Sequence, residues 1–305
     1  MYQAIKNIFF RKTAIKTFFI TRLAENQVEE KVWLKKGNFV VDITAKHSMI
    51  CLDPFCMAVW LPANQMSLLD PERVEMKFSK KNRITASINL SIIENIQTEN
   101  GTLLLYKIER VKNNQLNKLH RLVLFAYLLR SKKNTYQSRR VISALYSYPR
   151  KIIIVSYQDD EYYNIFPMDI QGHIAEEGIY ILGLRTTNVT LDKILEAKKV
   201  VICDTDQVDI NTVYNLGKHS STSPTRKEEM PFGTSDSLLF GFPVPSFCGG
   251  YKEVEIIHHK KMGYHMLLVG KVVHSKVIRE DAASLYHVGF LEFQKSNYSS
   301  IEGVF

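Results

Sequence analysis

Short β-prone segments separated by turn sequences run through most of the chain, and this pattern constrains the fold more than any other feature. In the first half, turns at residues 35–38, 53–54 and 100–101 each separate two runs of β-branched and aromatic residues. Strands joined by such short turns favour an antiparallel sheet or barrel over a doubly wound parallel sheet. We therefore expect a mainly β protein with some helices, in the α+β class.

The second half continues the pattern with two helices inserted. Alternation and β-branched residues predict strands at residues 151–157, 162–170, 179–184, 200–204, 253–259 and 265–274. Helical spacing predicts helices at 189–197 and 208–216, and Gly217 is expected as a left-handed cap of the second one. In the first half the period becomes helical after residue 114, which indicates a basic amphipathic helix before a polar linker at 131–135.

Length and charge together suggest two domains. The chain of 305 residues is about twice the usual domain size. Its net charge of +9 is uneven: residues 1–150 hold 25 Lys and Arg against 11 Asp and Glu, whereas residues 151–305 hold 15 against 20. We place a β-rich N-terminal domain of unknown function, ending in the basic helix, at 1–140 and a second domain at 141–305.

The excess of positive charge in the first half has two interpretations. Clustered Lys and Arg are the footprint of a nucleic-acid or other anionic partner, and they also make an ordinary solvated surface. Because no helix-turn-helix, finger or aromatic-basic RNA motif occurs there, the solvated surface is favoured and an anionic partner of residues 1–140 is not. The first 24 residues are basic and lack acids, which fits a transit peptide, a membrane-surface helix, or the favoured alternative of a segment packed on its own domain.

Several site classes lack their sequence signature. The four cysteines do not form a disulfide framework or a metal-ligand spacing, so we expect buried thiols in a reducing compartment, the cytoplasm, and no metal. No run of about 18 apolar residues predicts a membrane span. Neither a glycine-rich nucleotide loop nor a nucleophile elbow occurs.

Two polar stretches and one histidine are candidates for binding. The sequence GLRTTNVT at 183–190 places Arg185 and several hydroxyls between a strand and a helix, where a phosphate would be stabilised. The same residues could be ordinary caps, with Arg185 paired to a carboxylate. The donor-rich stretch at 216–227 suits either a loop over an anionic ligand or a plain solvent loop. His265 opens a strand after a glycine-containing turn, a rim position where a ligand can be met.

Three segments in order resemble the flavin reductase-like family, whose members have the FMN-binding split-barrel fold. They are YPRKIIIVSYQDDEYYNIFPMDI, YILGLRTTNVTLDKILEAKKVVICD and GFPVPSFCGGYKEVEIIHHKKMGYHMLLVGKVVHSKV, and the resemblance covers about residues 145–293. It implies a split β-barrel with flanking helices. The strand pattern and charge of the first half add a separate small β-rich domain with helices before it. It also implies a homodimer with the flavin near the interface.

The resemblance assigns a role to each candidate residue. Arg185, Thr186 and Thr190 would hold the FMN phosphate, with Asn188 nearby. The isoalloxazine ring would lie along a second group, Asn164, Met168, Asp169 and Ile170. Lys218, His219 and Ser220 would close over the phosphate side. His265 would be the catalytic-site histidine, near the flavin and the nicotinamide.

The implied function is an FMN-dependent oxidoreductase that resembles NAD(P)H:flavin reductases, with NADH or NADPH as electron donor and small molecules as partners. In such an enzyme the cofactor carries the redox chemistry, so a missing catalytic dyad does not argue against activity. Asp169, residues 175–178 and residues 226–229 depart from the family pattern, and this puts the nicotinamide reaction in question more than FMN binding. The alternative is a non-catalytic flavin-binding or sensing module whose basic N-terminal half docks to an anionic partner. A third possibility is another phosphate-bearing ligand, or none.

Overall fold

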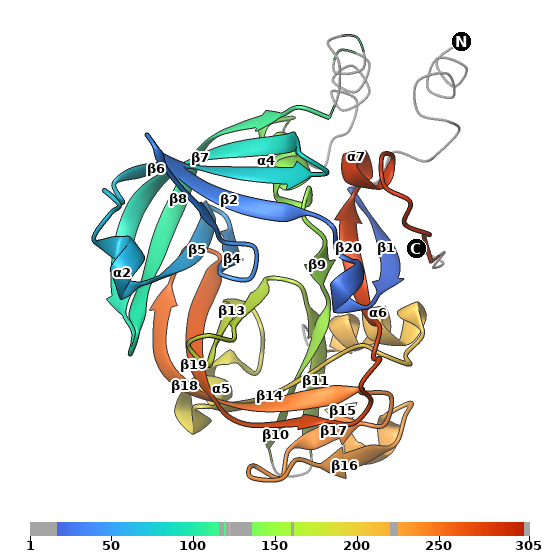
Figure 1. Ribbon diagram of the computed structural model, residues 1–305. Helices are drawn as coiled ribbons and strands as arrows, with labels where there is room; N and C mark the ends of the chain where they lie inside the picture. The colour runs from blue at the N-terminus through green and yellow to red at the C-terminus, as the bar shows by residue number, and fades with distance from the viewer. Residues whose placement is uncertain are drawn as a thin grey trace.

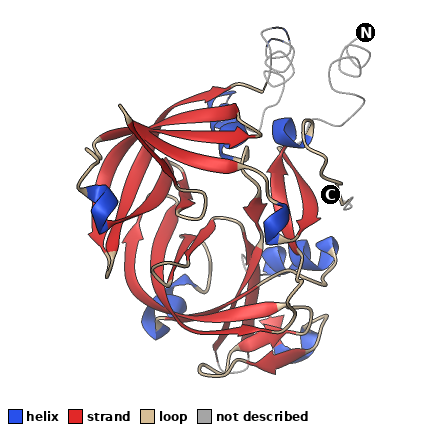
Figure 2. Cartoon of the chain, viewed as in Figure 1, coloured by secondary structure: helices blue, strands red, loops and turns tan. Residues whose placement is uncertain are grey.

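The computed structural model describes residues 17–115, 119, 122, 136–159, 162–219 and 225–301. Strands dominate these residues and helices are few and short (Figure 2). The expectation of a mainly β protein is therefore confirmed.

The first half forms a seven-stranded antiparallel sheet with the order β3-β2-β6-β7-β8-β5-β4. The three predicted turns join its strands, because each separates two runs that pair along their length. The short helix α2 (Ala63–Met66) follows β5, and α4 (Tyr136–Leu145) packs its apolar face into the core of this sheet. The strands are β2 (Lys31–Lys36), β3 (Phe39–Asp42), β4 (His47–Leu52), β5 (Phe55–Pro62), β6 (Arg73–Lys80), β7 (Arg83–Gln97) and β8 (Gly101–Asn113).

The second half forms an eight-stranded antiparallel sheet with the order β12-β13-β19-β18-β14-β10-β11-β15. Figure 1 shows this sheet curling from β13 through β18 and β14 to β11. All six strands predicted in this half are present, although the one expected at 162–170 ends at residue 168. The strands are β10 (Ile153–Asp159), β11 (Tyr162–Met168), β12 (Gln171–Ile174), β13 (Ile179–Arg185), β14 (Lys199–Cys203), β15 (Thr225–Arg226), β18 (Gly250–Lys261) and β19 (His265–Val277).

Two helices and a small hairpin flank the curled sheet. Helix α5 (Leu191–Ala197) follows β13 and α6 (Ile210–His219) follows β14, as the helical spacing predicts. The expected cap at Gly217 is wrong, because α6 continues through that residue. A Cβ atom on Gly217 would lie 3.3 Å from the ring of Pro167, so the glycine allows α6 to approach β11 closely. Strands β16 (Thr234–Asp236) and β17 (Pro243–Pro245) pair with each other, and the 3-10 turn η2 (Lys227–Glu229) precedes them.

A third sheet joins the two ends of the chain. Strand β20 (Ser284–Gly289) lies between β1 (Phe18–Leu23) and β9 (Arg150–Lys151). The 3-10 turn η1 (Glu25–Gln27) follows β1, and the short helix α7 (Phe290–Phe293) follows β20. On β1, the guanidinium of Arg22 donates hydrogen bonds to three backbone carbonyls, at Thr205, Val208 and Ala283. Part of the basic N-terminal segment is thus a strand of the fold, whereas residues 1–16 lie outside the described part.

The seven-stranded and eight-stranded sheets share one apolar core. Side chains from β4, β5 and β8 pack against side chains from β12, β13 and β19 in a single buried cluster. Two glycines allow this approach: a Cβ on Gly172 would meet Ser48, and one on Gly183 would meet the backbone of Ile50. The division near residue 140 stays a prediction, and both β1 and this core cross it. The helix predicted after residue 114 and the linker at 131–135 fall mostly outside the described residues, with Leu119 and Leu122 helical and exposed.

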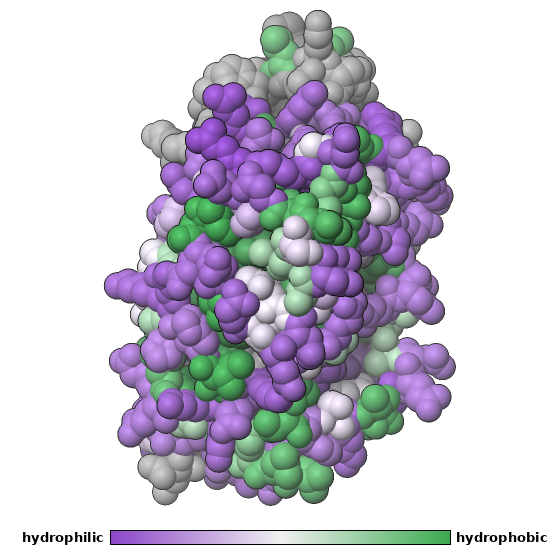
Figure 3. Space-filling model, turned by 60° about the vertical axis from the view of Figure 1, so that its left-hand side comes forward, coloured by the Kyte–Doolittle hydropathy of each residue, from purple (hydrophilic) through white to green (hydrophobic). Residues whose placement is uncertain are grey.

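The face shown in Figure 3 is largely hydrophilic, with apolar patches between hydrophilic residues. All four cysteines are buried free thiols, as expected. Within the described ranges no group of three His, Cys, Asp or Glu side chains could hold a metal ion. No helix in the described part has the length and apolar character needed to cross a membrane.

Candidate functional site

A cleft of about 220 Å³ lies where β11, β13 and the start of β19 meet, and we call it the β11–β13 cleft. Its lining comes from the end of β11 and the residues after it, from the end of β13 and the turn after it, and from the more distant His265, together with one residue of α6. The register of β13 and β19 places Arg185 directly opposite His265. The lining residues are Phe166, Pro167, Met168, Asp169, Ile170, Gly183, Leu184, Arg185, Thr187, Asn188, Gly217 and His265.

The cleft gathers half of the candidate site residues named from the sequence. Six of the twelve line it: Met168, Asp169, Ile170, Arg185, Asn188 and His265. Asn164 is buried on β11, on the same face as Phe166 and Met168 because strand residues alternate. The side-chain Oδ1 of Asn164 has no hydrogen-bond partner in the described part of the chain.

The turn after β13 holds Arg185 at the mouth of the cleft. Asn188 Oδ1 accepts a hydrogen bond from the Thr190 amide at 2.8 Å, which tightens the turn. The amide and the hydroxyl of Thr186 both donate to the Tyr264 carbonyl, at 3.1 and 3.2 Å. Arg185 is exposed, and among the described residues its guanidinium makes no ion pair or hydrogen bond. Thr190 is 1% exposed and its hydroxyl is unpartnered within those residues. Arg185 is therefore the free cation of this turn.

His265 presents one unused donor to the cleft. The imidazole is fully buried, and its Nδ1 accepts from the Leu52 amide at 3.5 Å and lies 3.5 Å from the Cys51 thiol. Burial and the positive charge of Arg185 lower the pKa of His265 to about 4, so the ring is neutral at pH 7. Since Nδ1 accepts, the ring proton is on Nε2, which is buried without a partner in the described part of the chain. The lining residue His265 thus has a neutral N–H donor that is unpartnered among the described residues.

Asp169 connects the cleft to a buried hydrogen-bonded chain. Its Oδ2 accepts from the Tyr146 hydroxyl and lies against His287 Nδ1, both at 2.6 Å. On the other side of the ring, His287 Nε2 is 2.6 Å from the Tyr214 hydroxyl on α6. Burial alone would raise the pKa of Asp169, but His287, Tyr146 and the buried Arg150 hold it below its ordinary value. The carboxylate is therefore charged and fixed in orientation.

The third group of candidates lies at or beyond the end of α6. Lys218 is exposed and its Nζ donates to Asn215 Oδ1 at 3.2 Å, and His219 is the last residue of the helix. Ser220 lies outside the described residues. Their neighbour Gly217 lines the cleft, so the helix end faces this region.

Some residues at the site were not found from the sequence. Gly217 was interpreted as a cap, and its contact with Pro167 depends on how α6 packs. His287 and Tyr146 reach Asp169 from β20 and from the residue after α4, and no sequence spacing relates them. A signal existed for β20, because SLYHVG is a short, mainly apolar run with aromatic and β-branched residues, which is consistent with a buried strand.

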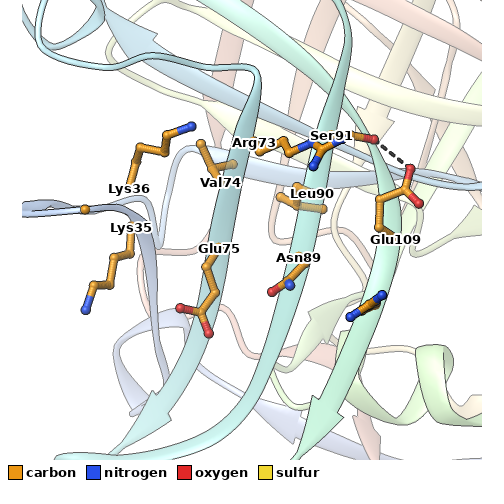
Figure 4. Close-up of a pocket in the computed structure, with 11 residues that line it drawn as sticks. Lys35, Lys36, Arg73, Val74, Glu75, Asn89, Leu90, Ser91 and Glu109 are labelled. Atoms are coloured by element: carbon orange, nitrogen blue, oxygen red, sulfur yellow. Dashed lines mark hydrogen bonds between the residues drawn. The ribbon is translucent and has the colours of Figure 1, made fainter.

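A second hollow, of about 960 Å³, is an open groove on the outer face of the seven-stranded sheet (Figure 4). Four cations and two carboxylates line it: Lys35, Lys36, Arg73, Arg110, Glu75 and Glu109. The charges are partly compensated, because Lys36 pairs with Asp70 at 3.0 Å and Glu75 pairs with Lys77 at 3.2 Å. The interpretation of the N-terminal charge as a solvated surface stays a prediction.

No family model and no curated protein matches the chain. Among solved structures, the chain is similar to flavin reductases and FMN-binding proteins over about half of its length. An FMN-binding protein from Thermus thermophilus with bound 1-cyclohex-2-enone is 20% identical, over 43% of this chain and 72% of that one, with a TM-score of 0.39. An NADH:FAD oxidoreductase from Streptomyces globisporus is 12% identical, over 57% and 96%, with a TM-score of 0.45. A flavin reductase complexed with NADP+ is 15% identical, over 50% and 90%, with a TM-score of 0.40. At these values the functional argument rests on this chain's own residues.

Proposed function

We propose that this protein binds FMN in the β11–β13 cleft and acts as a flavin-dependent oxidoreductase. The observation that carries the proposal is the convergence of Met168–Ile170, Arg185 and His265 on one cleft. These residues lie in the three segments that resemble the flavin reductase-like family.

The cleft has the polar groups that a flavin nucleotide requires. Phe166, Met168 and Leu184 supply apolar surface for a ring, and such surface with a few convergent polar groups is typical of cofactor sites. Arg185 has a guanidinium free to form two parallel hydrogen bonds with a phosphate. His265 Nε2 has a proton to donate, and a bound ligand would remove the cost of leaving that donor unpaired.

Each residue then has a defined task. Arg185 would bind the phosphate, whereas Thr186 would position the turn, since its hydroxyl already donates to Tyr264. His265 would donate one hydrogen bond to the ring, and Asp169 would hold a fixed negative charge beside it. FMN, when bound, supplies hydride acceptance, and NADH or NADPH is the proposed donor.

The cleft of one chain is too small for the whole cofactor. Ligand pockets usually measure about 300–1,000 Å³, and this one is about 220 Å³. One chain would therefore enclose part of the flavin and leave the rest at the surface. A homodimer in which a second copy covers the cleft is the arrangement that we propose.

Arg185→Ala tests the phosphate assignment. We expect weaker FMN binding by about 1.5–3 kcal/mol, the usual value of a hydrogen bond to a charged group. The measurement is titration of apoprotein with FMN, followed by flavin absorbance near 450 nm and by fluorescence. Arg73→Ala is the matched control, because Arg73 is also exposed but lies on the seven-stranded sheet. Equal FMN affinity in the two variants would contradict the assignment.

The catalytic part of the proposal has its own test. Anaerobic addition of NADH or NADPH to the FMN-loaded protein should bleach the flavin absorbance. Full flavin occupancy without bleaching by either nucleotide would instead support the non-catalytic flavin-binding module. If no flavin binds, the proposal is wrong and the remaining hypothesis is a cleft that binds another phosphate-bearing ligand or no ligand.

A further inference from the structure

A third hollow lies between the three-stranded sheet and the curled eight-stranded sheet. It is a partly open cavity of about 440 Å³, within the size range of small-molecule pockets. It shares no lining residue with the β11–β13 cleft. Its lining includes two half-buried lysines and two almost fully buried tyrosines, and we call it the lysine cavity: Lys151, Tyr180, Lys252 and Tyr286.

Strand pairing places these four residues around one space. Lys151 on β9 lies directly opposite Tyr286 on β20. Lys252 on β18 lies opposite Ile202 on β14 and opposite Ser275 on β19, and directly opposed residues share a face of a sheet. Tyr180 on β13 is packed in the same apolar cluster as Ile202. The apolar residues form the floor, and the two lysines reach the cavity from different sheets.

The polar ends of these side chains have no protein partner. Within the described residues neither lysine forms an ion pair, and neither tyrosine hydroxyl makes a hydrogen bond. Both tyrosines are almost fully buried, with 5% and 4% of their surface exposed, and both lysines are half-buried. Partly buried cations without an opposite charge are unfavourable. The cavity therefore contains two ammonium groups and two hydroxyls that a ligand could satisfy.

The pKa values of Lys252 and His173 show that both groups are partly buried and lie near other positive charges. Burial and repulsion by Lys151 lower the pKa of Lys252, and the charges of Glu25 and Asp204 offset this lowering only in part. On β12, burial and then the charge of Lys252 lower the pKa of His173 to about 4; Glu25 acts in the opposite direction and Lys151 adds to the lowering.

Acids lie near the cavity and act on the lysines, but among the described residues none forms an ion pair with Lys151 or Lys252. Asp204 Oδ1 accepts a hydrogen bond from the Gly249 amide at 2.7 Å, and burial raises the pKa of this carboxyl. Glu25 is exposed on η1 at the rim. Arg279, also at the rim, already pairs with Asp206 at 2.5 Å. Three further residues complete the charged groups of the cavity lining: Lys276, Glu280 and Asp281.

We propose that the lysine cavity is a second binding site, which takes a small organic anion with a carboxylate or phosphate group. Lys151 and Lys252 would bind the anionic group from opposite sides, and the hydroxyls of Tyr180 and Tyr286 would donate to its oxygens. The apolar floor would contact the rest of the ligand. Asp204 and Glu25 would accept from any hydroxyl or amino group that the ligand carries at the open side.

The test uses the full-length protein and four probes at constant ionic strength: inorganic phosphate, phenyl phosphate, acetate and benzoate. Binding is measured by calorimetry and by the rise in melting temperature. We expect phenyl phosphate or benzoate to bind more tightly than the matching inorganic phosphate or acetate, because only the former reach the apolar floor. The preferred member of the aromatic pair identifies the head group.

Lys252→Met keeps the length of the side chain and removes its charge. We expect a loss of affinity of about tenfold or more, as for a hydrogen bond to a charged group. The variant should also melt no lower than the wild type without the probe, because the repulsion from Lys151 is gone. Lys107→Met, an exposed lysine on β8, is the matched control and should bind normally.

Arg185→Ala separates this site from the β11–β13 cleft. Anion binding that survives in Arg185→Ala and is lost in Lys252→Met supports the lysine cavity, whether or not FMN binds elsewhere. The proposal is wrong if no probe binds, or if Lys252→Met and Lys107→Met bind the probes equally.

Discussion

Asp169 is the one acidic residue among those that line the β11–β13 cleft. From the sequence it is a departure from the family pattern and a charge that would oppose an anionic reduced flavin. In the structure its Oδ2 is engaged by Tyr146 and His287, and Arg150 is buried nearby. These three groups thus offset much of the negative charge of Asp169 on the side away from the cleft. The hydrogen-bonded chain fixes the loop after β11 and with it one side of the cleft.

Asp169→Asn should destabilise the protein at pH 7 by about 3 kcal/mol, because removal of one partner leaves the rest of a buried charged pair unsatisfied. The pKa of Asp169 is lowered by folding, so its contribution is present above the unfolded pKa of about 3.9 and is lost as the pH falls through the folded value. The difference from wild type should therefore shrink in acid. Urea unfolding at pH 7 and at low pH measures it.

Asp159→Asn is the control for that experiment, because Asp159 also pairs with a cation, Lys193, but with more of its surface exposed. A loss there of less than about 1 kcal/mol is expected for a surface pair. If Asp169→Asn costs no more than this, or costs the same at both pH values, the buried network does not stabilise the fold as described.

Individual strands and turns could be predicted from the sequence, because their signals are local. The Asn100-Gly101 turn and the alternation on either side specify β7 and β8 directly. Pairing between distant strands could not be predicted. Strands β1 and β20 are more than 250 residues apart, and neither segment has a residue pattern that identifies its partner. The same holds for the cleft: the sequence placed Arg185 and His265 in strands but could not set them side by side.

At the scale of elements, two buried carboxyls, those of Glu30 and Glu292, share one lysine and so connect helix α7 to the seven-stranded sheet. Lys80 on β6 lies 2.7 Å from Glu30 Oε1 and 3.6 Å from Glu292 Oε1 on α7. Glu30 Oε2 also accepts from the Tyr298 hydroxyl at 2.7 Å. Burial, and then the charge of Glu30, raise the pKa of Glu292 to about 8. One lysine therefore serves two carboxyls, of which Glu292 is protonated at pH 7.

This contact should make stability fall as the pH rises. Between the unfolded pKa of about 4.3 and the folded pKa, the folded state binds one proton more than the unfolded state, so unfolding becomes easier by up to about 1.4 kcal/mol per pH unit. Glu292→Gln imitates the protonated carboxyl and should remove this slope. Chemical denaturation at several pH values from 5 to 8 compares it with wild type and with Glu196→Gln, an exposed glutamate on α5. Parallel slopes in all three proteins would refute the explanation.

At the scale of the whole molecule, the seam between the two large sheets sets the position of the cleft. Cys51 and Leu52 of β4 lie against His265 of β19, so the N-terminal half supports a residue of the proposed flavin site. The difference in charge between the two halves of the sequence suggests two independent units. Charge describes the surface of each half, however, whereas the contact between the two sheets is made by buried apolar residues and leaves no trace in the charge. The shared apolar cluster makes the N-terminal half part of the support of the cleft.

Gly183 tests this coupling, since it belongs both to the seam and to the cleft lining. In Gly183→Ala the new methyl group would lie 2.5 Å from the Ile50 carbonyl oxygen and 2.5 Å from Ile170, so β4 must move away from β13. Overpacking of this kind costs about 1–3 kcal/mol. Gly233→Ala is the matched control, because its nearest new contact would be 3.8 Å away. Urea denaturation should show one cooperative transition, lowered only in Gly183→Ala, and FMN affinity should fall in the same variant because displacement of β4 disturbs His265. Two separate transitions would mean that the halves fold independently of each other. A loss of stability with unchanged FMN affinity would mean that the seam does not position the site.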